Sequence, residues 1–218
     1  MKINIPLLIL IILTLSFSSC AKKEESTTAA AAAGVCTTCD PLTSTTDADG
    51  SITVGSVELS GKYATSCFTN VSTLIDDDDA PSDAKSYGFL FIVRGNDNVT
   101  EELNYYTDST CTTKGYTKKN VFDNVTVGSA SGSNHQVAVN LTKVKFLVTT
   151  TVAETWAEAE KCSSCDLIVN TEYIMNISAA VQKEYNQWNV SAKTFEMGSA
   201  NIDNYDDTEL NGVKYTKQ

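Results

Sequence analysis

Short stretches in which apolar and polar residues alternate constrain the fold of this chain most strongly. In residues 167–178, "LIVNTEYIMNIS", apolar side chains fall mainly at every second position. A period of two is typical of a strand with one buried face. Residues 86–93, "SYGFLFIV", are apolar on both faces, as in a central strand. Turn-forming clusters such as "DADG", "RGNDN" and "SASGSN" separate these stretches and predict a succession of short strands.

Further segments of the same texture complete the predicted fold. They lie at residues 52–59, 63–74, 101–107, 113–127, 191–202 and 213–216. Between 136 and 150 the apolar positions change parity, which predicts a bulge or a tight turn near Thr142. Residues 152–161, "VAETWAEAEK", have helical spacing with Thr151 as the candidate cap, whereas 179–188 fit a second helix or a strand. We therefore predict an all-β fold, an antiparallel barrel or sandwich of about 8–10 strands with one or two short helices.

The charge balance restricts the partners of this protein. The 218 residues carry a formal net charge of −11, with a pI near 4.5. Binding to nucleic acid, or electrostatic adhesion to anionic lipid, requires clustered Lys and Arg side chains. We therefore expect no nucleic-acid partner, and any attachment to a membrane must come from another source.

The first twenty residues have the pattern of an export signal. Lys2 precedes an apolar stretch from Ile3 to Leu15, and small residues then lead into Cys20. A membrane-spanning helix needs about twenty apolar residues, and this stretch has only about thirteen. The pattern predicts a signal peptide at 1–19. It is followed by a tether at 20–51, too poor in large apolar residues to fold alone, and by a single β-rich domain at 52–218.

The segment "FSSC", which ends at Cys20, resembles the lipobox of bacterial lipoproteins, in the form seen in spirochaetes because Phe17 replaces the usual Leu. The resemblance implies that diacylglycerol is attached to the Cys20 sulfur and that a peptidase then cuts before this residue. Two or three fatty chains anchor a protein firmly, since each buried methylene contributes about 0.8 kcal/mol. The expected location is the cell envelope, and within the envelope we expect the outer membrane. The alternative is an ordinary signal peptide with an incidental cysteine.

An even number of cysteines remains after Cys20, which favours disulfides in an exported chain. The six are Cys36, Cys39, Cys67, Cys111, Cys162 and Cys165. Two pairs have Cys-x-x-Cys spacing, which also fits a zinc site or a redox motif. Neither pair opens a helix after a strand, as a redox motif requires, and the two pairs lie far apart for zinc. We expect Cys67 to pair with Cys111, with the Cys-x-x-Cys pairs either local or joined to each other.

A second resemblance concerns the β-rich domain. Residues 57–67, "VELSGKYATSC", are similar to the G-x-W opening of lipocalin-like barrels, with Gly61 at a kink and Tyr63 in the aromatic position at the barrel base. Residues 103–119, "LNYYTDSTCTTKGYTKK", resemble a "Y-x-D-x-x-C … G-x-Y" segment of bacterial lipocalin-like lipoproteins, and "ELNGVKYTKQ" resembles their final strand. The resemblance implies a cavity for a small apolar ligand. Its candidate lining or basal residues are Gly61, Tyr63, Phe89, Phe91, Phe146 and Trp156.

The sequence offers no recognisable catalytic or metal-binding pattern. His135 is the only histidine and lies in a turn rich in Ser and Gly. The acidic runs "LIDDDDAPSD" and "TDADGS" lack the twelve-residue ligand pattern of a calcium loop. We expect a non-catalytic protein without cofactor or metal. Its expected partners are the membrane, through the N-terminal lipid, and a small apolar ligand, or alternatively an envelope or host protein.

Overall fold

The computed structural model describes residues 34–177, 183–201, 204–205 and 210–218. The predicted signal peptide at 1–19, the candidate lipidation site Cys20 and the first part of the predicted tether lie outside these residues. The fold class can therefore be tested on the β-rich domain and on the end of the tether.

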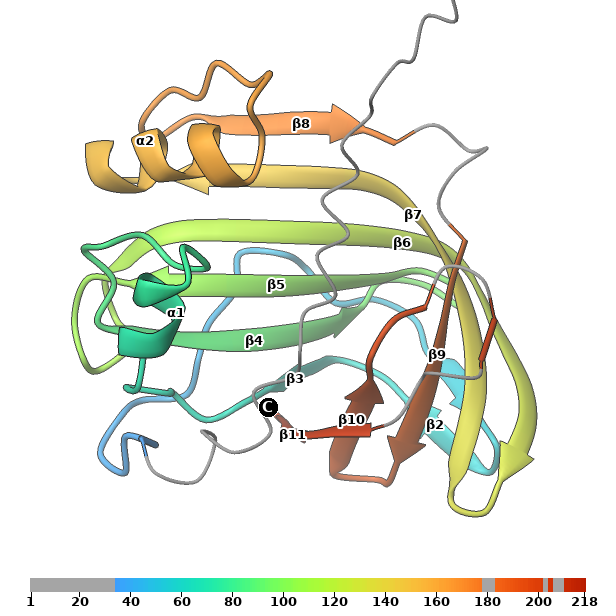
Figure 1. Ribbon diagram of the computed structural model, residues 1–218. Helices are drawn as coiled ribbons and strands as arrows, with labels where there is room; N and C mark the ends of the chain where they lie inside the picture. The colour runs from blue at the N-terminus through green and yellow to red at the C-terminus, as the bar shows by residue number, and fades with distance from the viewer. Residues whose placement is uncertain (1–33, 178–182, 202–203, 206–209) are drawn as a thin grey trace, which may run out of the picture.

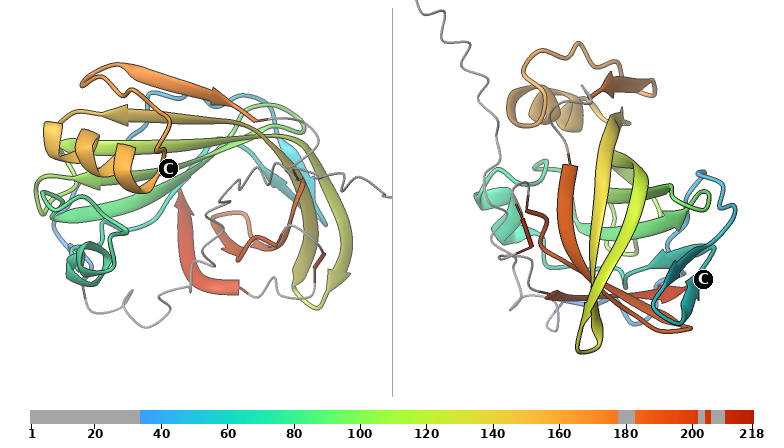
Figure 2. Two further views of the ribbon diagram at one scale, coloured as in Figure 1. Left: turned by 45° about the horizontal axis from the view of Figure 1, so that its top comes forward. Right: turned by 90° about the vertical axis from the view of Figure 1, so that its right-hand side faces the viewer.

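Eight antiparallel strands close into a barrel (Figure 1), in the ring order β6, β5, β4, β3, β11, β10, β9 and β7, with β6 and β7 paired to complete the ring. These strands are β3 (Lys62–Ala64), β4 (Ser86–Val93), β5 (Val99–Tyr106), β6 (Lys114–Ser131), β7 (Asn134–Val148), β9 (Lys183–Val190), β10 (Thr194–Gly198) and β11 (Leu210–Lys217). The two longest strands, β6 with 18 residues and β7 with 15, curve strongly along the barrel wall (Figure 2). The predicted all-β, lipocalin-like antiparallel barrel is confirmed.

The remaining elements lie at the two ends of the barrel. Helices α1 (Ser72–Asp76) and α2 (Thr151–Glu160) lie at one end, called here the helix end (Figure 1). The hairpin formed by β1 (Ile52–Val54) and β2 (Val57–Leu59) lies at the opposite end, called here the closed end. Strand β8 (Glu172–Asn176) pairs with the second half of β7 outside the ring.

Strand β7 changes partners at a bulge. Its first half pairs with β9 and its second half with β8. Along β6, Val121 pairs with Lys143 but Phe122 pairs with Leu141, so Thr142 is an extra residue whose hydroxyl donates to the Val121 carbonyl over 3.1 Å. The bulge predicted near Thr142 is therefore confirmed. It keeps the apolar residues on both sides of Thr142 directed into the barrel.

Several predicted elements differ from the structure. The strand predicted at 63–74 forms only at its start, in β3, and Ser72–Asp76 forms helix α1, where Leu74 and Ile75 pack against the core at the helix end. The strand predicted at 167–178 forms only at β8, because Asn170 takes a positive φ of 65° and turns the chain before it. The predicted helix begins one residue earlier, since the Thr150 side chain accepts the Ala153 amide over 3.1 Å and caps α2 in place of Thr151. The segment that fitted either a helix or a strand forms β9 from Lys183 onwards, and 179–182 lies outside the described residues.

The end of the predicted tether is part of the folded domain. Residues 34–51 cross the outer face of β4 and β5 as a strap, and Leu42 at its centre is only 4% exposed. Leu42 fits into a notch over Gly88, where a Cβ atom would lie 2.3 Å from the Leu42 Cδ1 atom. The domain therefore begins by Gly34 and not at Ile52. One buried leucine and the polar contacts described below hold a segment that is otherwise poor in apolar residues.

Six cysteines form three disulfides. Cys67 pairs with Cys111, as expected, with the Cα atoms 5.9 Å apart. The two Cys-x-x-Cys pairs are both local, Cys36 with Cys39 in the strap and Cys162 with Cys165 after α2. These pairings agree with the disulfide interpretation of the cysteine count. Of the two alternatives for the Cys-x-x-Cys pairs, the structure has the local one, and the two pairs are not joined to each other.

Candidate functional site

An aromatic cluster fills the closed end of the barrel. Phe195 lies at its centre and stacks on Phe91 with ring centroids 4.3 Å apart. Trp188 meets Phe195 edge-on at 5.2 Å, and Tyr215 lies 5.4 Å from it. These four side chains are at most 3% exposed. Tilted and edge-on packing of this kind is favourable for aromatic rings, so this end of the barrel is a solid core.

A second aromatic cluster lies at the helix end. It contains Tyr87, Tyr105, Tyr116 and Phe146, all buried. Trp156 on α2 meets the ring of Tyr116 edge-on at 5.0 Å and so joins the helix to the barrel. The inner face of the barrel is thus packed with aromatic side chains at both ends.

Between the two clusters, the inward-facing side chains are only half-buried. This level, called here the mid-barrel ring, contains the apolar residues Phe89, Leu103, Leu141 and Val213 and the polar residues Glu101, Lys118, Asn120 and Glu184. Its apolar members contact the cores on either side. These inward-facing apolar side chains are therefore less completely buried than the aromatic clusters on either side of them.

Glu101 is the best-connected polar member of the mid-barrel ring. The hydroxyl of Tyr215 on β11 donates to one carboxylate oxygen of Glu101 over 3.5 Å, and the Asn120 amide donates to the other over 3.5 Å. Strand β5, which carries Glu101, is not adjacent to β11 in the ring, so the first contact crosses the lumen. Burial and the Glu101 carboxylate together raise the pKa of Tyr215 well above its usual value.

Glu184 enters the mid-barrel ring from β9, where it pairs with Val139 of β7. Burial and the nearby Glu101 carboxylate raise the pKa of Glu184, Lys118 lowers it, and the net value is about 7. A carboxyl group with such a pKa changes its charge close to neutral pH. Two carboxyl groups from different walls of the barrel therefore act on each other across the lumen.

The residues expected from the lipocalin-like resemblance do not line a single cavity. Gly61 has φ +87°, and Tyr63 is fully buried at the closed end, where Phe91 also lies. Phe146 belongs to the cluster at the helix end. Trp156 lies on α2, so only Phe89 of the six belongs to the mid-barrel ring.

Sequence reasoning missed the polar members of this ring. A signal for them exists, because Glu101 falls at the same parity as Val99 and Leu103, and Glu184 at the same parity as Trp188. A charged residue at an apolar position of a strand indicates a lumen or a buried ion pair, and not a solvated face.

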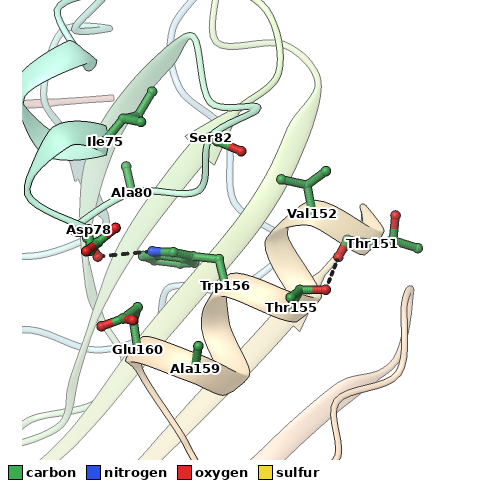
Figure 3. A pocket seen from close by; sticks show the side chains of 10 residues that line it. All are labelled: Ile75, Asp78, Ala80, Ser82, Thr151, Val152, Thr155, Trp156, Ala159 and Glu160. Atoms are coloured by element: carbon green, nitrogen blue, oxygen red, sulfur yellow. Dashed lines mark hydrogen bonds between the residues drawn. The ribbon is translucent and has the colours of Figure 1, made fainter.

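An open groove lies between the two helices (Figure 3). It has a volume of about 650 Å³ and is lined by Ile75, Val152 and Trp156 together with smaller and acidic side chains. The indole nitrogen of Trp156 donates to the Asp78 carbonyl over 3.0 Å at its edge. The groove lies outside the barrel and is separate from the mid-barrel ring.

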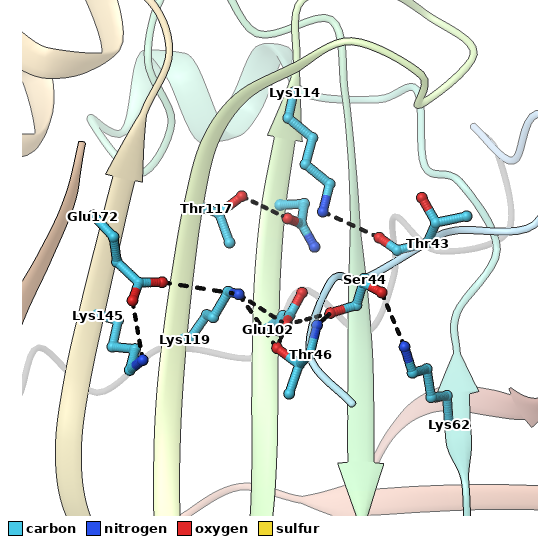
Figure 4. A network of polar contacts seen from close by, with 11 residues as sticks. Thr43, Ser44, Thr46, Lys62, Glu102, Lys114, Thr117, Lys119, Lys145 and Glu172 are labelled. Atoms are coloured by element: carbon cyan, nitrogen blue, oxygen red, sulfur yellow. Dashed lines mark hydrogen bonds and ion pairs between the residues drawn. The ribbon is translucent and has the colours of Figure 1, made fainter. Parts of the chain in front are cut away.

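A polar network holds the strap against the outer face of the barrel (Figure 4). Glu102 is fully buried there, and the hydroxyls of Ser44 and Thr46 donate to its carboxylate. Lys119 lies 3.5 Å from the same carboxylate. Burial alone would raise the pKa of Glu102, but these hydrogen bonds and the lysine charges lower it overall. The network anchors the strap and is a structural feature.

The segment that resembles lipocalin-like lipoproteins also has a structural role. The Asp108 carboxylate accepts hydrogen bonds from the backbone amides of Thr110, Thr112 and Thr113. These bonds shape the loop between β5 and β6 and hold Cys111 at a positive φ of 55°, where it pairs with Cys67. His135, the only histidine, lies in β7 opposite Trp188 at the closed end.

The fold of this chain is a closed antiparallel barrel of eight strands, consistent with a lipocalin-like all-β fold. No family model and no curated protein matches its sequence. In the ranges that the structure describes, neither helix is long and apolar enough to cross a membrane. The same ranges contain no cluster of three or more His, Cys, Asp or Glu side chains that could hold a metal ion.

Proposed function

We propose that this protein is a non-catalytic bacterial lipoprotein whose barrel binds a small, mainly apolar ligand. The observation that supports this function is the mid-barrel ring, where Phe89, Leu103, Leu141 and Val213 stay half-buried between two packed aromatic clusters. Binding sites for small molecules are mostly apolar, with a few placed polar groups, and the mouths of β-barrels are a preferred location. A ligand at this level would remove the remaining apolar surface from water.

The proposed anchor is diacylglycerol on Cys20, in the envelope and at the outer membrane. Thirteen residues lie between Cys20 and Gly34, where the strap begins, and this part of the chain spans at most about 50 Å when fully extended. Such a tether leaves the barrel free to take a ligand from the bilayer or from the fluid beside it. The acidic surface makes the lipid the main source of membrane attachment.

A second candidate function is contact with an envelope or host protein. It is favoured by large apolar side chains that stay exposed outside the barrel: Val152 on α2 is 40% exposed, Ile168 after it is 60% exposed, and Ile174 on β8 is 48% exposed. Val152 also lines the groove between the helices. Exposed apolar side chains form an interaction surface where they gather into one contiguous patch.

A probe that fluoresces in apolar surroundings distinguishes the two functions. We expect N-phenyl-1-naphthylamine, a neutral probe, to bind the wild-type protein and to bind the Leu141→Trp variant at least about tenfold more weakly, because the larger side chain fills the mid-barrel ring. Ile174→Trp, on the outer face of β8, is the matched control and should leave binding unchanged.

Val213→Trp repeats the test from the opposite wall of the barrel and guards against local misfolding of one variant. Thermal unfolding monitored by circular dichroism establishes that each variant is folded. Equal binding by all four proteins would place the probe outside the lumen and contradict the proposed function.

A further inference from the structure

The groove between the two helices offers a fixed apolar surface outside the barrel. Trp156 reaches from α2 towards Asp78 (Figure 3), and its indole nitrogen donates to the Asp78 carbonyl over 3.0 Å. The same ring meets Tyr116 edge-on at 5.0 Å but is only half-buried, so part of it stays accessible from the groove. Ile75 and Val152 line the groove beside it and form an apolar floor. An aromatic side chain that is already held in place loses little freedom when a partner packs on it.

The rim of this groove is acidic. Asp78 lines it from the segment after α1 and Glu160 from the last turn of α2, and both residues are exposed. None of the described residues that line the groove carries a positive charge. Lys161 follows α2 and lies 5.1 Å from the centre of the Trp156 ring, but its charge is matched by Asp79 at 3.4 Å. The two rim carboxylates therefore leave the groove with a negative charge that a cationic partner would balance.

The open shape of the groove favours a protein as the partner. Most of the lining residues are exposed, Val152 at 40% among them. Sites for small molecules enclose most of the ligand surface, whereas an open groove covers only one side of what binds there. A segment of another protein can place one apolar side chain on Trp156 and keep its remaining surface outside. An anionic lipid surface would instead be repelled by the acidic rim.

From this juxtaposition of a fixed indole, an apolar floor and an acidic rim, we infer that the groove binds a basic segment of a partner protein. An apolar side chain of that segment packs on Trp156, and flanking Lys or Arg side chains pair with Asp78 and Glu160. Opposite charges at the rim of an interface speed association and select the partner more than they add affinity. The inference rests on the second candidate function, contact with another protein, and is independent of the ligand proposed for the barrel.

Three fluorescein-labelled peptides that differ only in charge test the inference. Each has a central Leu-Phe-Leu, flanked on both sides by two Lys, two Gln or two Glu residues. In fluorescence anisotropy at low salt, we expect the Lys peptide to bind at least about fivefold more tightly than the Gln peptide, and the Glu peptide to bind most weakly. High salt should reduce these differences, because it screens charges that are exposed.

Matched variants locate the binding. In the double variant Asp78→Asn, Glu160→Gln the preference for the Lys peptide should be lost. The double variant Asp47→Asn, Glu58→Gln removes the same charge from exposed positions outside the groove and should keep the preference.

The apolar floor has its own pair of variants. Val152→Ser should weaken binding of the Lys and Gln peptides by about threefold or more, because it removes apolar surface from the groove. Ile168→Ser, at an exposed apolar residue outside the groove, should leave binding unchanged. Circular dichroism establishes that each variant is folded.

The outcomes separate this inference from the function on which it rests. Equal binding of the three peptides, weakened by Val152→Ser, would overturn the preference for a basic partner and leave an apolar docking surface in place. Binding that no groove variant changes, or no binding of any peptide, would contradict the groove as a docking site. A dimer in sedimentation velocity that Val152→Ser dissociates would assign the groove to a second copy of this chain and likewise overturn the inference. Leu141→Trp, which fills the mid-barrel ring, should bind the Lys peptide as the wild type does.

Discussion

Replacing Cys20 with Ser should abolish incorporation of radiolabelled palmitate into this protein. The sulfur of Cys20 is the proposed attachment point for diacylglycerol, and a hydroxyl group does not replace the thiol in that reaction. The protein should also move from the detergent phase to the aqueous phase in a phase-separation assay. Loss of the fatty chains removes a large hydrophobic contribution, since each buried methylene is worth about 0.8 kcal/mol.

The matched control for this experiment is Ser19→Ala. This substitution keeps a small residue directly before Cys20 and should leave palmitate labelling intact. Intact labelling would show that the neighbouring sequence tolerates change. Palmitate in the Cys20→Ser protein would refute the attachment site. Wild-type protein without label would refute lipidation altogether, and with it the proposed location in the envelope.

Removing the disulfide between Cys67 and Cys111 should have the largest effect on stability. This bond closes a loop with a sequence separation of 44. The loss of chain entropy that a loop of this size imposes on the unfolded state corresponds to about 4 kcal/mol. We therefore expect the double variant Cys67→Ser, Cys111→Ser to lose about 4 kcal/mol of unfolding free energy in urea denaturation.

The local disulfide in the strap is the control. Cys36 and Cys39 are separated by only 3 positions in sequence, and the same relation gives about 1.5 kcal/mol for such a short loop. The double variant Cys36→Ser, Cys39→Ser should therefore be clearly more stable than the first one. Equal losses in the two double variants would show that loop closure does not determine how these bonds stabilise the fold.

The sequence predicts a strand of the barrel well where the burial of its two faces is visible in the residue pattern. Strand β4 is apolar on both faces because its inner face lines the barrel and its outer face lies under the strap. The parity change at Thr142 identifies the bulge in β7, since side chains at odd and even positions point to opposite faces. Local alternation is enough for these predictions.

The strap could not be predicted, because its stability depends on partners far away in the sequence. Leu42 fits into the notch that Gly88 leaves, and the hydroxyls of Ser44 and Thr46 donate to the buried Glu102 carboxylate. Composition alone makes residues 34–51 resemble the tether that precedes them. Single-residue contacts of this type leave no periodic signal.

The mid-barrel ring escaped prediction for a related reason. Charged side chains such as Glu101 and Glu184 are interpreted as solvated positions unless their parity is compared with that of neighbouring apolar residues. Tyr63 and Phe91, which were candidates for the cavity lining or the barrel base, both lie in the packed core at the closed end. Large aromatic side chains stabilise a core whenever neighbouring rings can pack on them, and here they do so.

Native mass spectrometry of the protein, extracted gently from its own membrane, tests the central claim most directly. The claim is that the barrel binds a small, mainly apolar molecule at the level of the mid-barrel ring. The wild-type protein should retain a non-covalent adduct of lipid-like mass, and the lumen-filling Leu141→Trp variant should lose it while keeping its covalent lipid. An adduct of equal abundance in both proteins, or none in the wild type, would contradict the account.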